Sequence, residues 1–309
     1  MDFPIIELPD PDECEAWLEK HFHPEGQRCP HCQASREESH FFRVNQGSRL
    51  CVYRCQRCEG IYNLYSNTVF AESQLTPVHV VLLLRGVSQG KPSNQLAREI
   101  GLTEKTVLKW RHRLQAQAES LQPETPLVDK ETESDEMFQN TGEKGREHFD
   151  PADPPRRRAN KRRGRGTFAN DRLPILGTIG RQSGQARLQV AKDTTGQTLR
   201  AHVHQFTQPG PHVYTDEYDS YNGIRRTRST VTHSTHEWAR DKDGDGICEV
   251  HTNTVEGMWT GLRNFLPPFR GMSKHFLSDY VAIHEFCVNL KVISRQFVAH
   301  LVRLHSFYC

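Results

Sequence analysis

Four cysteines in the N-terminal part of the chain have the type and spacing of ligands for a metal ion. They form two CxxC pairs, Cys29 with Cys32 and Cys55 with Cys58, and 22 residues lie between the pairs. Such pairs are typical of a zinc ribbon, in which four thiolates hold Zn²⁺ in a tetrahedron. With four protein ligands the ion has no open position, so we expect a structural site. Cys51 is a rival ligand that would break the symmetry of the pairs.

Three carboxylates further along the chain are candidates for metal-dependent chemistry at phosphorus, namely Asp135, Asp216 and Glu256. Carboxylate oxygens are ligands that Mg²⁺ prefers, and substrate phosphates and water complete its octahedron. Two such ions about 4 Å apart activate an attacking oxygen and stabilise a leaving one. The chemistry requires that separate elements bring the three acids together.

The stretch EVHTNTVEGMWTGLRNF, residues 249–265, predicts the helix that carries Glu256. Its apolar residues recur at helical spacing, and Thr252 or Asn253 is placed to cap it. At about 100° per residue, seven residues return almost to the starting angle, so Glu256 and Arg263 share one edge of the helix. The alternative is a pair of solvated charges on an ordinary amphipathic helix.

The other two acids are expected on strands. Side chains alternate along a strand, so Glu133 and Asp135 share one face while Glu136 points to the other. We therefore favour Asp135 over Glu136 as the ligand, and Glu133 remains a possible supporting residue. Asp216 ends a short strand in VYTDEYDSY.

The order of elements around these acids predicts a ribonuclease-H-like α/β domain. The run LPILGTIGRQSGQARLQVA predicts a hairpin that turns at Ser183 and Gly184. A helix over residues 195–206 is expected before the strand of Asp216, and the helix of Glu256 follows later. In such a fold, carboxylates from the first strand, the end of the fourth strand and a late helix converge beside a mixed sheet flanked by helices.

Residues 75–117 predict three short helices, with a turn at Gly101 and caps at Ser93 and Thr103. Two short helices around a glycine turn are typical of a helix-turn-helix that binds DNA. The basic residues of its second helix are Lys105, Lys109, Arg111 and Arg113. The alternative is a generic three-helix bundle with a solvated basic face. The expected fold class is thus multidomain α+β, with a zinc ribbon and a helix-turn-helix before the catalytic domain.

A basic arm over residues 154–166 lies between the first expected strand and the hairpin. Such a run is typical of a disordered segment or of an arm that contacts nucleic acid. Its seven basic residues are Arg156, Arg157, Arg158, Lys161, Arg162, Arg163 and Arg165. We expect these residues to contact DNA phosphates without reading sequence.

Composition narrows the class of protein. The chain has 309 residues and a net charge of +2, and no apolar run reaches the length of a membrane span. The start of the sequence has neither a basic end nor an apolar signal segment. Nine cysteines in a chain of this length do not indicate a secreted disulfide framework. We therefore expect a soluble intracellular protein with reduced thiols.

Three further patterns are weaker. The stretch DKDGDGICEVHT begins like an EF-hand loop, but its twelfth residue is Thr252 rather than the bidentate Glu of a calcium site. Tyr218 and Tyr221 could stack on bases, although aromatic residues after a strand are more often core. Three histidines with one cysteine match no common zinc spacing, and surface or substrate-contacting roles are favoured for His233, His236, His251 and Cys248.

The chain resembles the DDE transposases of the ISXO-like insertion-sequence family. The matching stretches are ESDE around Asp135, RRRANKRRGRGTFANDR, VYTDEYDSY around Asp216, and HTNTVEGMWTGLRNFLPPFRG around Glu256. In that family a Lys or Arg follows the third acid by seven residues, and Arg263 stands there in this sequence. The resemblance covers nearly the whole chain.

The resemblance implies an enzyme that binds the terminal inverted repeats of its element, cleaves DNA and transfers the 3′ ends to target DNA. It implies Mg²⁺ or Mn²⁺ at Asp135, Asp216 and Glu256, with Arg263 on a phosphate. A homo-oligomer on paired DNA ends is implied too, in the cytoplasm of a prokaryote and associated with the nucleoid. Rival functions are a DNA-binding regulator with an inactive domain and a metal-dependent nuclease without strand transfer.

The expected domain division has four parts. Residues 1–72 form the zinc-ribbon region and residues 73–120 the helix-turn-helix. Residues 121–295 form the catalytic domain with its basic arm, and residues 296–309 form a C-terminal helical tail.

Overall fold

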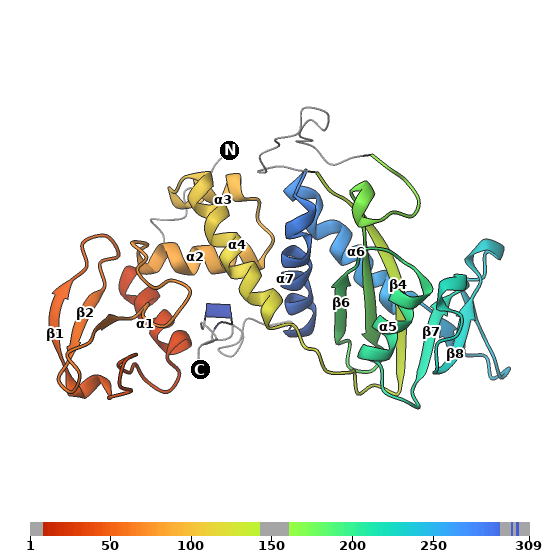
Figure 1. The fold of residues 1–309 in the computed structure, drawn as a ribbon, viewed down its shortest axis with the longest axis horizontal. Helices are drawn as coiled ribbons and strands as arrows, with labels where there is room; N and C mark the ends of the chain where they lie inside the picture. Colours follow the sequence, from red (N-terminus) through yellow and green to blue (C-terminus); the bar gives the residue numbers. More distant parts are fainter. Residues whose placement is uncertain (1–8, 143–160, 291–297, 299–300, 303–309) are drawn as a thin grey trace. The chain divides into compact units, whose positions relative to one another are not determined.

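The computed structural model describes residues 9–142, 161–290, 298 and 301–302. The chain divides into two compact units, of which one comprises Met1–Leu121 with Leu290–Cys309 and the other Gln122–Asn289 (Figure 1). None of the described helices is long and apolar enough to cross a membrane. The expected C-terminal tail lies mostly outside the described residues.

The N-terminal unit begins with a helix and a small antiparallel sheet of order β1-β2-β3. The elements are α1 (Pro11–Phe22), β1 (Ser39–Val44), β2 (Cys51–Cys55) and β3 (Ile61–Asn63). Asp10 caps α1, because its Oδ1 accepts hydrogen bonds of 2.9 Å from the backbone N–H groups of Asp12 and Glu13. Cys55 is the last residue of β2, so the strand delivers one cysteine pair to the loop that follows it.

Three further helices of this unit are α2 (Pro77–Ser88), α3 (Ser93–Ile100) and α4 (Glu104–Ser120). Gly101 ends α3 in the left-handed conformation, at φ 69°, and the Thr103 hydroxyl caps α4 by accepting from Thr106 N. Ser93 is the first residue of α3 rather than its cap. Its hydroxyl instead accepts a hydrogen bond of 2.9 Å from Arg111 Nε on α4.

The second unit contains a mixed five-stranded sheet of order β6-β5-β4-β7-β8. Its strands are β4 (Glu131–Asn140), β5 (Arg172–Gly180), β6 (Ala186–Val190), β7 (His212–Asp216) and β8 (Thr227–Val231). The first three strands pair antiparallel, and β7 and β8 run parallel to β4. A helix, α5 (Gly196–Phe206), connects β6 to β7. This arrangement, with the small cysteine-bearing sheet and the helices before it, confirms the predicted fold class.

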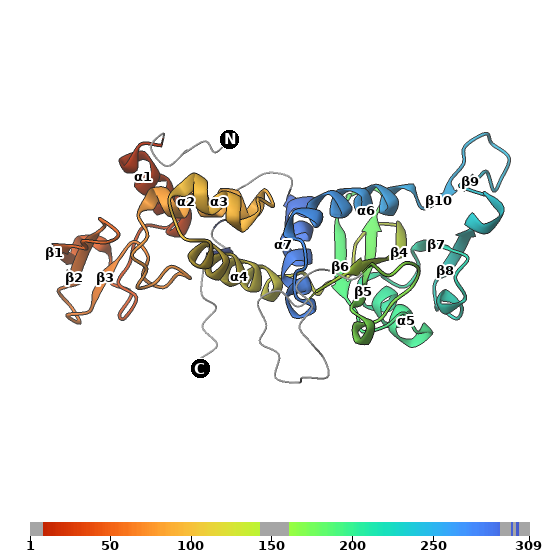
Figure 2. The ribbon, with the colours of Figure 1, turned by 90° about the horizontal axis from the view of Figure 1, so that it is seen from above.

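Helices cover both faces of this sheet, with α6 (Asn253–Phe265) on one face and α5 on the other (Figure 2). The α6 face is completed by α7 (Leu277–Leu290), and the short strands β9 (Ala239–Arg240) and β10 (Val250–His251) lie between β8 and α6. Side chains of consecutive β5 residues enter the cores on opposite faces of the sheet. Ile175 packs with α6 and α7, whereas Leu176 packs with α5.

Gly177 on β5 leaves room for the indole of Trp259 on α6. A Cβ at position 177 would lie 2.6 Å from Trp259 Cη2 and 2.9 Å from Met258 Cε. Both groups belong to the core between α6 and the sheet, so neither moves freely.

We therefore predict that Gly177→Ala lowers the free energy of unfolding by about 1–3 kcal/mol, because the added methyl group overpacks the core. A suitable control is Gly257→Ala on α6, since a Cβ there would have no heavy atom within 4 Å. The control should be neutral or stabilising, because alanine favours helix over glycine by about 1 kcal/mol. Thermal unfolding of both full-length variants measures the difference, and equal melting temperatures would refute the packing argument.

Candidate active site

Asp135 and Asp216 lie at the same level of two adjacent parallel strands. Glu133 of β4 pairs with Tyr214 of β7, so the residues two positions further along, Asp135 and Asp216, are neighbours. Asp135 is opposite Gly177 in the antiparallel pair with β5, and its side chain therefore faces α6. Glu136 faces the other side of the sheet, as the alternation predicts, where its Oε2 accepts a 2.8 Å hydrogen bond from the Tyr221 hydroxyl.

Trp259 connects the helix to the first acid. Its Nε1 donates a hydrogen bond of 2.8 Å to Asp135 Oδ2, and its ring lies over Gly177. A buried indole needs a partner for its N–H, and here a carboxylate supplies it. The contact fixes the orientation of the Asp135 carboxylate, and it engages Oδ2 rather than Oδ1.

Glu133 holds the start of α6 against β4. Its side chain is fully buried, and its Oε2 accepts a 2.9 Å hydrogen bond from Val255 N in the first turn of α6. Its Oε1 accepts from the Thr254 hydroxyl at 2.9 Å and from Arg181 Nε at 2.8 Å, and His251 Nδ1 lies 3.2 Å away. These partners engage both oxygens, so Glu133 acts by holding the start of α6 against β4.

Glu256 projects from the first turn of α6 and stays half-exposed. His233 Nε2 lies 3.4 Å from its Oε1, and the Thr252 hydroxyl donates to the same oxygen at 3.4 Å. Arg263 is exposed two turns further along the helix. Neither Thr252 nor Asn253 caps α6 through its side chain, since Glu133 binds the free N–H group instead.

The carboxylates of β4 and β7 repel one another. Burial, followed by the negative charge of Asp216, raises the pKa of Asp135 to about 6, and Glu256 contributes in the same direction. Burial also raises the pKa of Asp216. Burial and then the charge of Asp135 raise the pKa of Glu136 to about 7. Hard oxygen donors with an excess of negative charge fit divalent cations such as Mg²⁺, which would relieve this repulsion.

The three acids are not gathered as closely as the cysteines. Among the described residues, only two groups of possible ligands have all their ligand atoms within 4.8 Å of one another. One is the cysteine set, and the other consists of Asp241, Asp243 and Glu249.

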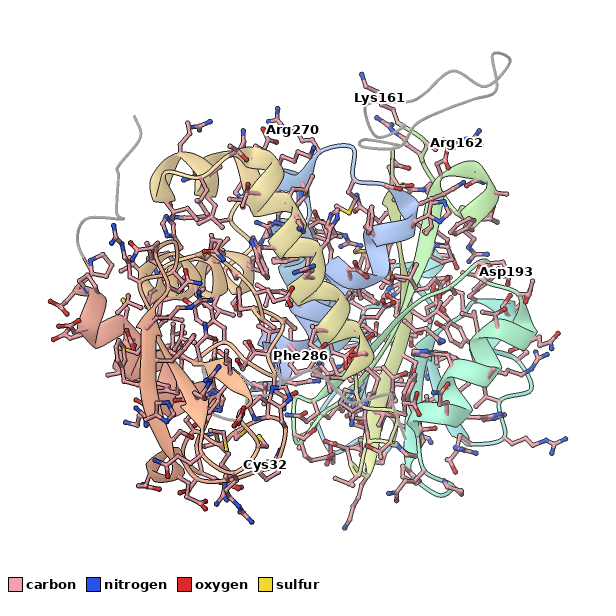
Figure 3. The ribbon with its side chains drawn as sticks, turned by 60° about the vertical axis from the view of Figure 1, so that its left-hand side comes forward. Cys32, Lys161, Arg162, Asp193, Arg270 and Phe286 are labelled. Carbon is pink, nitrogen blue, oxygen red and sulfur yellow. The ribbon has the colours of Figure 1, made fainter. Side chains whose placement is uncertain are left out.

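The four predicted cysteines form one cluster, in which Cys32 is visible in Figure 3. The sulfurs of Cys29 and Cys58 are 3.5 Å apart, as are those of Cys32 and Cys55. Four sulfurs at about 2.3 Å from a tetrahedral ion would lie about 3.8 Å apart. The cluster therefore has the composition and size of a zinc site, and Cys51 is not part of it.

The predicted DNA-binding residues differ in exposure. Lys105, Lys109 and Arg113 are exposed on α4. Arg111 is fully buried, donates to Ser93 Oγ and also binds the carbonyl of Lys91. It ties α4 to the start of α3, so the structure corrects the prediction that this residue contacts DNA.

Only the C-terminal half of the basic arm is described. Arg156, Arg157 and Arg158 lie outside the described residues, whereas the remaining members are exposed. These are Lys161, Arg162, Arg163 and Arg165, the first two of which are labelled in Figure 3.

The residues of the EF-hand-like loop and the histidines form contacts within the protein. Asp241 accepts hydrogen bonds from Gly244 N and Gly246 N within its own loop, and Glu249 accepts from Lys242 N. The described histidines form no metal cluster with Cys248. His251 instead joins Glu133, and His233 lies beside Glu256. Tyr221 is a core residue, as expected of an aromatic residue after a strand.

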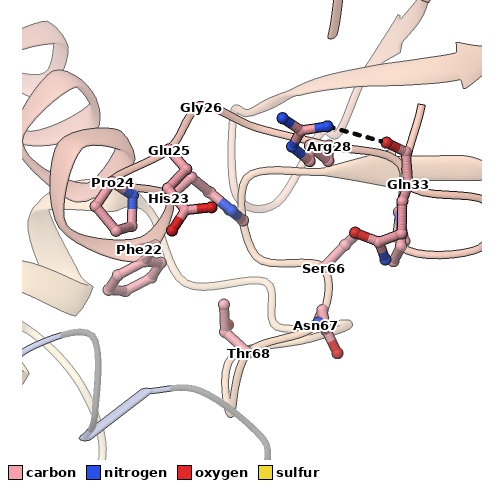
Figure 4. A pocket seen from close by; sticks show the side chains of 11 residues that line it. Phe22, His23, Pro24, Glu25, Gly26, Arg28, Gln33, Ser66, Asn67 and Thr68 are labelled. Carbon is pink, nitrogen blue, oxygen red and sulfur yellow. Dashed lines mark hydrogen bonds between the residues drawn. The ribbon is translucent and has the colours of Figure 1, made fainter. Parts of the chain in front are cut away.

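A pocket of about 260 Å³ lies in the N-terminal unit (Figure 4). Its walls come from the end of α1 and from the loops that carry Arg28 and Asn67. None of the predicted site residues lines it.

Sequence reasoning missed Trp259 as a partner of Asp135 and Arg181 as a partner of Glu133. The helical spacing in residues 249–265 assigns Trp259 only to the apolar stripe, although the N–H of a buried indole requires a nearby acceptor. Arg181 follows β5 in the hairpin turn and carries no local signal. Its Nη1 also donates to Glu249 O and its Nη2 to His251 O, so it joins the hairpin to β10.

Comparisons with known sequences identify a matching family model and a relative. Residues 143–289 match the family model of the ISXO2-like transposase domain, so Asp216, Glu256 and Arg263 lie inside the match and Asp135 lies before it. An uncharacterized protein in transposable element ISH50 of Halobacterium salinarum is 31% identical over 262 residues, which cover 83% of each chain.

Two solved structures show weak similarity. The catalytic core domain of BIV integrase has a TM-score of 0.29 and 12% identity, over 54% of this chain and 87% of that one. The Mos1 transposase paired-end complex has a TM-score of 0.26 and 10% identity, over 72% and 77%. At these TM-scores the solved structures add nothing to the assignment. On the strength of the sequence matches, the chain belongs to the ISXO2-like transposase family.

Proposed function

We propose that this chain is a DDE transposase that binds the terminal inverted repeats of its element, cleaves DNA strands and joins the 3′ ends to target DNA. The observation that carries the proposal is the crowding of Asp135 and Asp216 at one level of β4 and β7, beside the helix of Glu256. Membership of a transposase family supports the same reading.

The proposed metal ligands are Asp135, Asp216 and Glu256. When bound there, Mg²⁺ or Mn²⁺ would activate the attacking oxygen and stabilise the leaving oxygen at phosphorus. The protein's part is to hold the carboxylates in place. Trp259 orients Asp135, and Glu133 fixes the first turn of α6, from which Glu256 projects.

Arg263 is proposed to bind a DNA phosphate. It stands on the same edge of α6 as Glu256 and is exposed, so its planar guanidinium is accessible to the backbone of a bound strand. An arginine binds phosphate through two parallel hydrogen bonds, which fixes the position of the strand as well as its charge.

The N-terminal unit is proposed to recognise DNA ends. Zn²⁺ at Cys29, Cys32, Cys55 and Cys58 would stabilise the small sheet, and the exposed Lys105, Lys109 and Arg113 would contact DNA. The basic arm would add phosphate contacts. We propose assembly as a homo-oligomer on paired ends, and the domain division that the sequence predicts, at residues 72, 120 and 295.

The first test incubates purified protein with its flanking DNA and Mg²⁺ and scores cleaved and joined products. Cleavage without joining would indicate a nuclease, and binding without either product would indicate a regulator. Both outcomes contradict strand transfer.

Replacing any one of the three proposed metal ligands should remove both cleavage and joining. Asp135→Asn, Asp216→Asn and Glu256→Gln are each expected to lower cleavage and joining by at least about 10³-fold, because one site serves both steps. Asp219→Asn, an exposed acid close to β7, serves as the control and should remain active. End binding, measured by gel shift, should survive in all four variants. A folded Glu256→Gln variant with normal strand transfer would remove this residue from the site.

The raised pKa of Asp135 predicts a pH-dependent stability. A carboxylate with a pKa of about 6 in the folded chain destabilises the fold as the pH rises through 6, since its unfolded pKa is about 3.9. In Mg²⁺-free buffer, Asp135→Asn should therefore be more stable than wild type by about 1–3 kcal/mol at pH 8. The gap should shrink towards pH 5, and added Mg²⁺ should stabilise only the wild type. If the difference in melting temperature between wild type and Asp135→Asn stays the same from pH 5 to pH 8, this prediction is wrong.

The cysteine cluster should hold one zinc ion per chain. Cys29→Ser or Cys58→Ser should release it and unfold the small sheet, because thiolate ligation contributes directly to folding of such a module. Cys51→Ser is the matched control and should keep the ion. Elemental analysis of the purified variants, with circular dichroism, distinguishes the two classes, and a zinc-free wild type would overturn the assignment.

A further inference from the structure

The backbone around Arg165 is fixed by the start of β5. Gly164 has a φ of 72°, and its carbonyl accepts a 2.6 Å hydrogen bond from Arg172 Nε. Gly166 is buried, and a Cβ there would lie 2.3 Å from the backbone oxygen of Arg172. The two glycines therefore allow the backbone of residues 164–166 to pack against Arg172. This packing fixes the backbone position of Arg165, which lies between them.

Arg165 points towards the candidate active site. Its guanidinium carbon lies 3.2 Å from the centroid of the Tyr218 ring. Tyr218 lies two residues after the end of β7, and its backbone N–H donates a 3.0 Å hydrogen bond to Asp216 Oδ1. The tyrosine hydroxyl donates to Thr194 O at 3.4 Å, so both ends of the ring are anchored.

The charge of Arg165 acts on Asp216 of the candidate site and on Glu136 on the other face of the sheet. It works against burial by lowering the pKa of Asp216, and it lowers the pKa of Glu136 in the same way. Arg165 is thus the member of the described basic arm whose guanidinium is stacked beside the acids. Arg163, two residues earlier, is exposed and has no ring contact or ion pair among the residues that the structure describes.

We propose that Arg165 binds a backbone phosphate of the DNA strand at the carboxylates, with Tyr218 as the platform that orients its guanidinium. Stacking leaves the N–H groups at the edge of the guanidinium plane free to form two parallel hydrogen bonds with phosphate oxygens. Arg165 is therefore a residue of the active site, whereas the rest of the arm contacts DNA nonspecifically.

This inference rests on the proposed function, and single-turnover cleavage of end DNA by the full-length protein tests it. At saturating DNA, Arg165→Ala should cleave about 10²-fold more slowly, because one preorganised charge near the reacting phosphate is lost. Its Kd should change less than about threefold, since a single phosphate contact contributes little to total affinity. Arg165→Lys should recover part of the rate as a point charge. Arg225→Ala, which removes an exposed arginine elsewhere in this unit, should match wild type.

A second measurement identifies the phosphate itself. Single methylphosphonate substitutions around the cleavage site remove one negative charge at a time. At one position the substitution should slow the wild type but leave Arg165→Ala unaffected, because the partner is already missing. A wild type that does not cleave would refute the proposed function. A wild type that cleaves, with Arg165→Ala at the same rate or with additive effects at every position, would overturn only the role of Arg165.

Discussion

The site depends on one buried carboxylate that is not itself a candidate ligand. Glu133 accepts hydrogen bonds from Val255 N, the Thr254 hydroxyl and Arg181, and it has no contact with water. It caps α6 from a strand 122 residues away in sequence, and it stands two residues before Asp135. Together with the Trp259–Asp135 hydrogen bond, this cap positions the helix of Glu256 relative to Asp135, and the positive charge of Arg181 compensates the buried carboxylate.

Repulsion between carboxylates destabilises the fold around Asp135. Asp135, Asp216 and Glu136 are drawn together by the sheet, and burial reduces the screening of their charges. Arginines border this region, but each has another partner: Arg181 is engaged by Glu133, Arg165 stacks on Tyr218, and Arg228 donates to the backbone carbonyl of Asp216. The fold therefore positions acids whose repulsion these arginines relieve only in part, since the pKa values of Asp135 and Asp216 stay raised. A cost in stability of this kind is common where proteins hold functional groups close together.

Local sequence signals predicted most of the elements. Thr103 and Thr195 cap the helices that they were expected to begin, and β7 ends at Asp216. The spacing of the cysteines predicted their cluster. Contacts between distant residues were not predictable in this way. The sequence predicts that Arg111 contacts DNA, because its actual partner Ser93 lies on another helix, and it predicts a cap for α6 from Thr252 or Asn253 rather than from β4.

Trp259, Gly177 and Asp135 form one unit spread over three elements. The indole fits only because position 177 lacks a side chain, and its N–H is satisfied only because position 135 carries an acceptor. None of these positions is free to drift alone during evolution. A lineage that replaced the tryptophan by a smaller residue would open a cavity, relax the constraint at 177 and leave the first acid without its donor. If the constraint holds, the residues at positions 135, 177 and 259 should vary together among related sequences.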